Sequence, residues 1–113
     1  MPDCPVTVVL PCLDEAASLP GVLAALPTGY RALVVDNNST DDTADVARRH
    51  GAQVVAESRP GYGAAVHAGV VAATTPIVAV LDGDGSLDPA ELPRLVDDVE
   101  RGADMAIGRR RAR

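Results

Sequence analysis

The sequence predicts an α/β domain with a mainly parallel sheet. Short apolar runs rich in Val, Ile and Leu, typical of strands buried on both faces, alternate with segments of helical apolar spacing. The connections between these segments are short and rich in Gly, Pro, Asp and Asn. Because strands and helices alternate along the chain, we expect successive strands to run in the same direction, joined by right-handed crossovers.

The first predicted strand covers residues 6–10 (VTVVL) and ends at Pro11. A helix is expected to follow it, beginning at Asp14 or Ser18 and ending before Pro27. The apolar side chains of this helix share one face, which indicates packing against a sheet. They are Leu19, Val22, Leu23 and Leu26.

The second predicted strand covers residues 32–35 and ends on Asp36, before a turn rich in Asn, Ser and Thr. Ser39 or Thr40 can cap a helix N-terminus, which predicts a helix over residues 41–50. Acidic residues in its first turn and arginines in its last match the helix dipole. The remaining predicted elements are a strand over 52–56, a helix over 64–73, a strand over 77–81, a helix over 89–101 and a last short strand over 105–107.

The composition sets limits on function. A chain of 113 residues with 47% hydrophobic residues forms one domain, whose core must be aliphatic because Phe and Trp are absent. The net charge of −6 argues against nucleic-acid binding. No apolar run approaches the length of about 20 residues that spans a membrane, and the N-terminus lacks a signal-peptide pattern. We therefore expect a cytoplasmic protein, with Cys4 and Cys12 as buried apolar residues rather than a redox or metal pair.

Two carboxylates follow the strand over 77–81, at Asp82 and Asp84. Ligands of parallel sheets gather at the carboxyl ends of the strands, and two adjacent carboxylates repel each other unless a cation or proton lies between them. The pattern predicts a Mg²⁺ or Mn²⁺ site. A polar turn with Asp capping the next helix is the alternative. A calcium loop is excluded because Leu87 and Pro93 stand where that loop needs Gly and Glu.

Other strand ends also carry polar residues. Asp36 can accept hydrogen bonds from a nucleobase or ribose, or can serve only its own turn. Asp14 and Glu15 follow the first strand, where one contacts a nucleotide or both only favour a helix N-terminus. The loop over 59–63 (RPGYG) can turn Arg59 and backbone N–H groups toward a phosphate, or can be a plain flexible turn.

Four separated motifs occur in one order: residues 6–15 (VTVVLPCLDE), 34–43 (VVDNNSTDDT), 61–69 (GYGAAVHAG) and 80–84 (VLDGD). Together they resemble the family 2 glycosyltransferases of the GT-A fold. The similarity is greatest to the branch that transfers sugars to polyprenyl phosphates, of the dolichol-phosphate mannose synthase type. The resemblance implies a three-layer, Rossmann-like GT-A domain over residues 1–113.

The resemblance also implies roles for individual residues. Asp84 would be the direct metal ligand of a DxD motif, and Asp82 would lie near the ribose, diphosphate and metal. The donor would be a nucleotide-diphospho-sugar, and the acceptor a lipid phosphate at the inner face of the membrane. The remaining donor-binding residues would be Pro11 and Glu15 in the first loop, Asp36 at the base or ribose, and Gly61 and Gly63 in the loop beside the nucleotide.

The sequence departs from the family pattern in several places. Leu13 stands where many relatives have an aromatic residue that packs on the base, and Ser86 stands where the mannose-synthase branch often has Gln. The family's acceptor half, with its catalytic base, lies further along the chain. The resemblance therefore implies a donor-binding half that stops after about five strands, with no catalytic base assigned and an open sheet edge through which copies can pair.

Two other functions remain open on the sequence. The first is a nucleotide-sugar-binding module without turnover. The second is a phosphohydrolase, because the stretch LDGDGSLD also resembles the first motif of the haloacid-dehalogenase-like enzymes. There Asp82 would be the nucleophile and Asp84 the acid/base. That family usually carries the motif on its first strand, whereas here it follows the fourth predicted strand.

Overall fold

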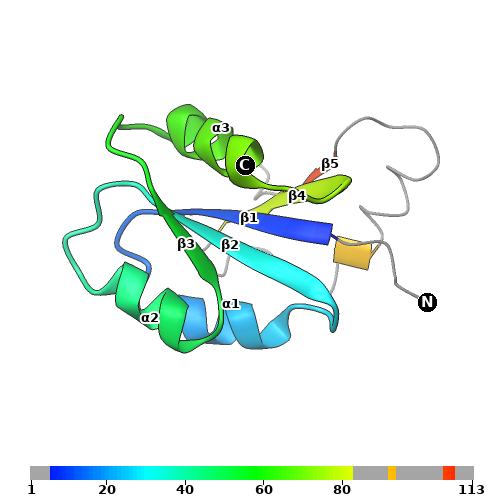
Figure 1. Ribbon diagram of the computed structural model, residues 1–113. Helices are drawn as coiled ribbons and strands as arrows, with labels where there is room; N and C mark the ends of the chain where they lie inside the picture. The colour runs from blue at the N-terminus through cyan, green and yellow to red at the C-terminus, as the bar shows by residue number, and fades with distance from the viewer. Residues whose placement is uncertain (1–5, 83–91, 94–105, 109–113) are drawn as a thin grey trace, which may run out of the picture.

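A computed structural model of the chain describes residues 6–82, 92–93 and 106–108. Within them the strands form one sheet in the order β3-β2-β1-β4-β5, and every neighbouring pair is parallel (Figure 1). The predicted parallel sheet is thus confirmed. The strands are β1 (Val6–Cys12), β2 (Tyr30–Asp36), β3 (Gln53–Ala56), β4 (Ile77–Leu81) and β5 (Ala106–Gly108).

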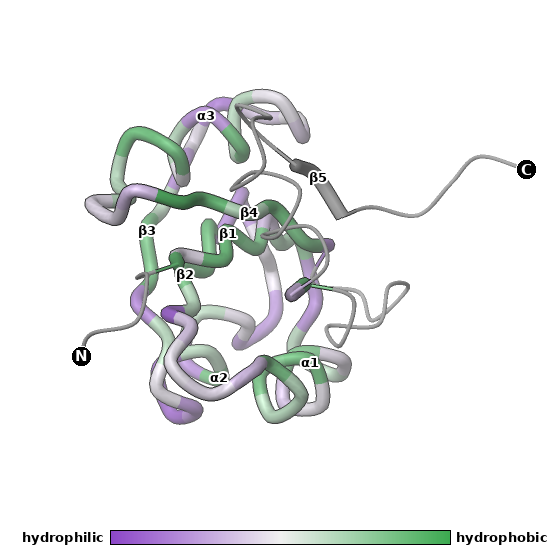
Figure 2. Tube along the Cα trace, turned by 90° about the vertical axis from the view of Figure 1, so that its right-hand side faces the viewer, coloured by the Kyte–Doolittle hydropathy of each residue, from purple (hydrophilic) through white to green (hydrophobic). Residues whose placement is uncertain are grey.

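The helices cover both faces of this sheet. In Figure 2 the helices α1 and α2 lie below the strands and α3 lies above them, which gives the three layers expected of a Rossmann-like domain. Among the described residues, no helix combines the length and apolar character needed to cross a bilayer. The helices are α1 (Leu19–Ala25), α2 (Thr43–Arg49) and α3 (Tyr62–Ala72).

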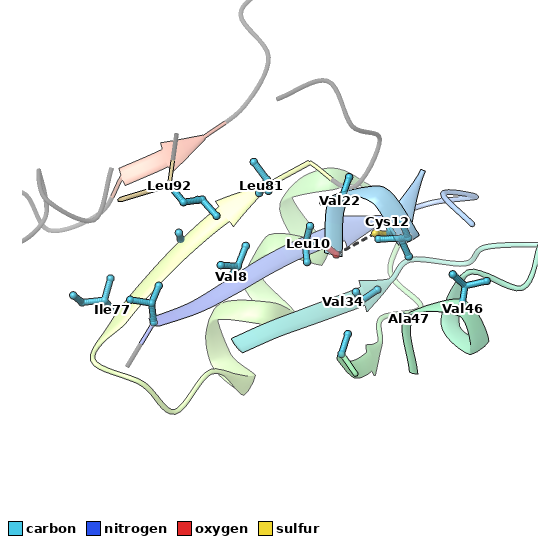
Figure 3. Close-up of a cluster of buried hydrophobic side chains, with 14 residues drawn as sticks. Val8, Leu10, Cys12, Val22, Val34, Val46, Ala47, Ile77, Leu81 and Leu92 are labelled. Carbon is cyan, nitrogen blue, oxygen red and sulfur yellow. Dashed lines mark hydrogen bonds between the residues drawn. The ribbon is translucent and has the colours of Figure 1, made fainter. Parts of the chain in front are cut away.

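The first core lies between the sheet and helices α1 and α2. Alternate side chains of the strands, such as Val8, Leu10 and Val34, point to this face and are completely buried (Figure 3). They pack with Val22 from α1 and Val46 from α2. This alternation follows from the two-residue period of a strand.

The second core lies between the sheet and α3. Val9, Val35 and Val80 are fully buried on this side and cluster with Ala65 of α3. The helix comes so close to the sheet at Gly69 that a Cβ atom there would collide with the Val9 side chain. Both cores are aliphatic, as the composition predicts, and β1 is buried along its whole length.

The sheet has a topological switch point between β1 and β4. The chain moves outward from β1 through β2 to β3, and then returns to place β4 on the other side of β1. Because the connections on the two sides of β1 lie on opposite faces, a crevice opens at the carboxyl ends of β1 and β4. The residues that follow these strands therefore form the expected ligand site.

Several predicted boundaries are wrong. The helix predicted over 41–50 begins at Thr43, with Asp42 as its N-cap, because Ser39 and Thr40 bond to the first loop instead of capping it. The helix predicted from residue 64 begins at Tyr62, so Gly63 lies in its first turn. Strand β3 begins one residue later than predicted and β5 is shifted by one residue. Most of the helix predicted over 89–101 lies outside the described residues.

Candidate nucleotide-binding site

A pocket of about 310 Å³ lies at the switch point. Its walls come from the carboxyl end of β1 and the loop after it, the loop after β2, the start of α3 and the end of β4. The described residues that line it are Pro11, Cys12, Leu13, Glu15, Asn37, Gly61, Tyr62, Ala65 and Asp82. Segments far apart in the sequence are thus joined in one cavity.

The loops that follow β1 and β2 are tied together by reciprocal hydrogen bonds. Asp14 Oδ1 accepts hydrogen bonds from the backbone N–H groups of Thr40, at 2.6 Å, and Asp41, at 3.2 Å. The backbone N–H of Asp14 in turn donates to Ser39 Oγ at 2.9 Å. Asp14 has a φ of 56°, a left-handed conformation that Asp tolerates better than most residues. Its role is therefore to join two loops. Of the two predicted helix starts, Ser18 is confirmed as the N-cap of α1 and Asp14 is wrong.

A second set of bonds completes this connection. The backbone N–H of Ala16 donates to Asp41 Oδ2, and that of Glu15 donates to the fully buried Thr43 Oγ1 at 3.0 Å. Asp41 also accepts hydrogen bonds from the hydroxyl and backbone N–H of Thr43. These bonds, led by the Thr43 hydroxyl, lower the pKa of the Asp41 carboxyl. Glu15 is thereby held where it lines the pocket.

Asn37 holds the loop between β3 and α3. Its side chain is 6% exposed. Its Nδ2 group donates to the carbonyl oxygens of Glu57, at 2.8 Å, and Arg59, at 2.7 Å, while Oδ1 accepts from the backbone N–H of Gly61 at 3.1 Å. Both amide hydrogens are committed to the protein itself. Gly61 has a φ of 113°, which only glycine adopts readily, and the chain turns there into α3.

The electrostatic field of the pocket is negative. Burial raises the pKa of the Cys12 thiol well above its ordinary range, and the charges of Glu15, Asp36, Asp41 and Asp82 raise it further. Glu15 and Asp82 line the pocket itself, whereas none of its described lining residues is cationic. A diphosphate entering this field would be repelled unless a cation accompanied it.

The described residues offer a carboxylate ligand for a divalent metal, at Asp82, but no complete set of ligands. Asp82 supplies a hard carboxylate oxygen in the pocket, immediately after β4, as Mg²⁺ and Mn²⁺ prefer. In the described part of the chain, no group of three or more His, Cys, Asp and Glu side chains is arranged to hold a metal. The predicted direct ligand, Asp84, lies outside the described residues. A metal bound here would be shared with the phosphates of its ligand.

The structure brings together four of the predicted site residues and separates three. Pro11, Glu15, Gly61 and Asp82 line one pocket. Asp36 does not line it and accepts a hydrogen bond from the Ser39 N–H at 3.1 Å, so the turn role is realised and its nucleotide contact stays a prediction. Gly63 lies within α3. Arg59 is exposed and paired with Glu57 at 3.1 Å, which lowers the pKa of Glu57 and raises that of Arg59.

Five lining residues are not among the site residues predicted from the sequence: Cys12, Leu13, Asn37, Tyr62 and Ala65. Asn37 was treated as a turn residue, and its contacts lie 20 to 24 residues away along the chain. Tyr62 lies in the Gly-rich loop, for which the sequence predicts ligand contacts by Arg59, the glycines and backbone N–H groups.

Comparison with known proteins identifies relatives along almost the whole chain. The family model for glycosyl transferase family 2 matches residues 7–113. An uncharacterized glycosyltransferase of Mycobacterium tuberculosis is 74% identical over 106 residues, which are 94% of this chain and 49% of that protein. A dolichyl-phosphate hexose transferase of Haloferax volcanii is 36% identical over 106 residues, 91% of this chain and 46% of that protein. The chain thus spans about half the length of the curated relatives it matches.

The fold of this chain is also similar to that of solved glycosyltransferase structures. Glucosyl-3-phosphoglycerate synthase of Mycobacterium tuberculosis, crystallised with Mn²⁺, UDP and glucosyl-3-phosphoglycerate, superposes with a TM-score of 0.72 at 31% identity. The match covers 83% of this chain and 39% of that one. The family inferred from the four motifs is confirmed.

Proposed function

This chain belongs to glycosyl transferase family 2, and we propose that it binds a nucleotide-diphospho-sugar donor with Mg²⁺ or Mn²⁺. In this proposal it forms the donor-binding part of an inverting, metal-dependent glycosyltransferase. The family assignment favours this function over the phosphohydrolase, which rested on the DGD motif alone. The crystallised relative bound to Mn²⁺ and UDP supports the choice of ligand.

The observation that carries the proposal is the composition of the switch-point pocket. Its lining combines the apolar residues Pro11, Leu13 and Ala65 with the carboxylates of Glu15 and Asp82. A ligand with an apolar planar part and a metal-bound anionic part matches both kinds of lining. A nucleoside diphosphate has this chemistry, because its base is planar and its diphosphate carries a divalent cation.

The proposed roles follow the position of each residue. Pro11 and Glu15, which line the pocket, contact the nucleoside. Asp36 ends the neighbouring strand β2 outside the pocket lining, and in this proposal the oxygen that its turn does not use bonds to the base or ribose. Gly61 lets the backbone approach the nucleotide without a side chain in the way. Asp82 and Asp84 would hold the metal, which would offset the negative charge that develops on the departing nucleoside diphosphate.

The acceptor in this proposal is a polyprenyl phosphate. The name of the Haloferax relative supports it, because that protein is a dolichyl-phosphate hexose transferase. A protein acting on a lipid phosphate would work at the membrane surface, which fits a cytoplasmic protein held peripherally at the inner face. Pairing of copies through a sheet edge belongs to the same proposal, since β3 ends the sheet in the described chain.

A transfer assay tests this function. The protein is incubated with UDP- or GDP-linked sugars carrying a radiolabel, Mn²⁺ and polyprenyl phosphate in detergent, and labelled lipid is extracted. Labelled lipid that disappears with EDTA and in the Asp82→Asn variant would support the proposal. Nucleotide binding without labelled lipid would identify a binding module without turnover. Release of inorganic phosphate from simple phosphomonoesters, with no sugar transfer, would favour the phosphohydrolase.

A further inference from the structure

Two large apolar side chains are exposed at the rim of the switch-point pocket. Leu13 is 54% exposed and Tyr62 is 45% exposed, and both line this pocket although they come from different elements. Among the described residues, the one other large hydrophobic side chain that is strongly exposed is Val71. Apolar surface concentrated at a cavity indicates that a ligand covers it.

We propose that Tyr62 is a substrate-contacting residue whose ring packs on the planar base of the nucleotide, supplying the aromatic surface that Leu13 lacks. This inference rests on the proposed nucleotide-sugar function and adds a residue that neither the motifs nor the comparisons assign. Tyr62 is the only aromatic residue among those that line the pocket in the described chain.

The backbone around Tyr62 is fixed before any ligand arrives. The preceding residue, Gly61, donates its N–H to Asn37 Oδ1 at 3.1 Å. The carbonyl oxygen of Gly61 accepts the N–H of Ala65 at 3.2 Å in the first turn of α3. Because both the N–H and the C=O of Gly61 are hydrogen-bonded, the backbone that leads into Tyr62 is held in place, which reduces the backbone entropy lost on binding.

The proposal also predicts how the base is recognised. Both Nδ2 hydrogens of Asn37 already bond to Glu57 and Arg59, so this amide has no donor left for the edge of a base. Stacking on an aromatic ring tolerates every base, since each has a π-face. The contribution of Tyr62 should therefore be similar for UDP and GDP.

Calorimetric titration of three proteins tests the contact. Wild type, Tyr62→Phe and Tyr62→Ala are titrated with UDP, GDP and inorganic pyrophosphate in the presence of Mn²⁺. Base stacking predicts that Tyr62→Phe binds both nucleotides like wild type and that Tyr62→Ala binds both about five- to tenfold more weakly. Pyrophosphate affinity should be the same in all three. Equal nucleotide affinity in Tyr62→Ala, or a parallel loss for pyrophosphate, would overturn the inference.

Tyrosine fluorescence gives a second readout that does not depend on the alanine variant folding. This chain has no Trp and no Phe, and its two tyrosines are Tyr30 and Tyr62. Tyr30 begins β2 at the opposite end of the sheet, about 20 Å away by strand length. Nucleotide should change the emission of wild type and Tyr30→Phe equally and leave that of Tyr62→Phe unchanged. A change that persists in Tyr62→Phe would contradict the contact.

The same titrations separate this inference from the function on which it rests. A folded wild type that binds neither UDP nor GDP would overturn the proposed function and the inference together. A wild type that binds nucleotide while Tyr62→Ala binds equally well would overturn the inference alone. Far-UV circular dichroism of each protein establishes that the compared chains are folded.

Discussion

Asn37 Oδ1 and the Gly61 backbone N–H form a hydrogen bond of 3.1 Å that joins residues 24 positions apart. It connects the end of β2 to the start of α3, across the pocket that both segments line. Together with the bonds from Asn37 to Glu57 and Arg59, it means that one buried amide holds the loop between β3 and α3 in place. The shape of the pocket therefore depends on a side chain that need not touch the ligand.

The first prediction concerns this amide. Asn37→Ala should lower the free energy of unfolding by about 2 kcal/mol, because it removes three hydrogen bonds of a buried amide and leaves part-buried carbonyl and N–H groups without their partners. Nucleotide affinity should fall as well, since Gly61 and Tyr62 lose their anchor. Urea unfolding followed by circular dichroism measures the first effect, and calorimetry the second.

Asn38 provides the matched control for Asn37. It is exposed, makes one side-chain bond to the Ser58 carbonyl, and has a φ of 69° that glycine adopts without strain. Asn38→Gly should cost less than about 1 kcal/mol. If both variants were equally stable, the buried amide would have no special role.

The second prediction concerns the bonds between the first two loops. Asp14→Ala removes the acceptor for two backbone N–H groups and places Ala at a φ of 56°. Together these should lower the free energy of unfolding by about 2 kcal/mol. Asp14→Asn keeps an acceptor oxygen and tolerates the backbone, so it should retain most of the stability. Equal losses in the two variants would show that the connection depends on something other than these bonds.

The third prediction concerns the approach of α3 to the sheet. Gly69→Ala should destabilise the protein by about 1–3 kcal/mol, because the new Cβ meets the side chains of Val9 and Val35. Gly21→Ala in α1 is the control, since its Cβ meets nothing within 4 Å and Ala favours the helix by up to about 1 kcal/mol. Thermal unfolding of both variants should shift in opposite directions. A Gly69→Ala protein as stable as wild type would mean that the helix can move away freely.

These elements show what a single sequence reveals about this fold. The strands and their parallel direction were predictable because each is a short β-branched apolar run and helical segments with short connections lie between them. The start of α2 was not, because Ser39 and Thr40 have the side chains of helix caps yet bond to Asp14 across 25 and 26 residues. Local preference was overridden by a contact between loops.

Some residues of the candidate site were predictable from the sequence and others were not. Asp82 and Glu15 were predictable because they follow buried strands, and the topology of a parallel sheet brings strand ends together. Arg59 was predicted to face a phosphate; it pairs with Glu57, two residues before it, and its phosphate contact stays a prediction. Asn37 and Tyr62 could not be assigned because their positions depend on the contact between the loop after β2 and the loop before α3. The spacing of residues in the sequence does not predict that contact.

The fourth prediction concerns Cys12. Because burial and nearby carboxylates raise the pKa of its thiol, the folded protein keeps a proton that the unfolded chain releases near its ordinary value of 9.0. The free energy of unfolding should therefore fall as the pH rises above about 9, and the slope should be smaller in Cys12→Ala.

Alkylation provides a direct check on Cys12. In a Cys4→Ser background at pH 8, iodoacetamide should modify the native protein far more slowly than the protein in urea, since the thiolate is the reacting form. Mass spectrometry of timed samples measures both rates. Equal rates would show that Cys12 is neither buried nor protonated as the structure indicates.

The most direct test of the donor site is calorimetric titration of UDP and GDP into the protein, with and without Mn²⁺. The pocket carries carboxylates at Glu15 and Asp82 and no cationic side chain among its described lining residues, so binding should require the metal. We expect measurable affinity with Mn²⁺ for at least one nucleotide, a loss of at least about tenfold without it, and a similar loss in Asp84→Ala. Equal affinity with and without metal, or no binding by a folded protein, would contradict a metal-dependent donor site.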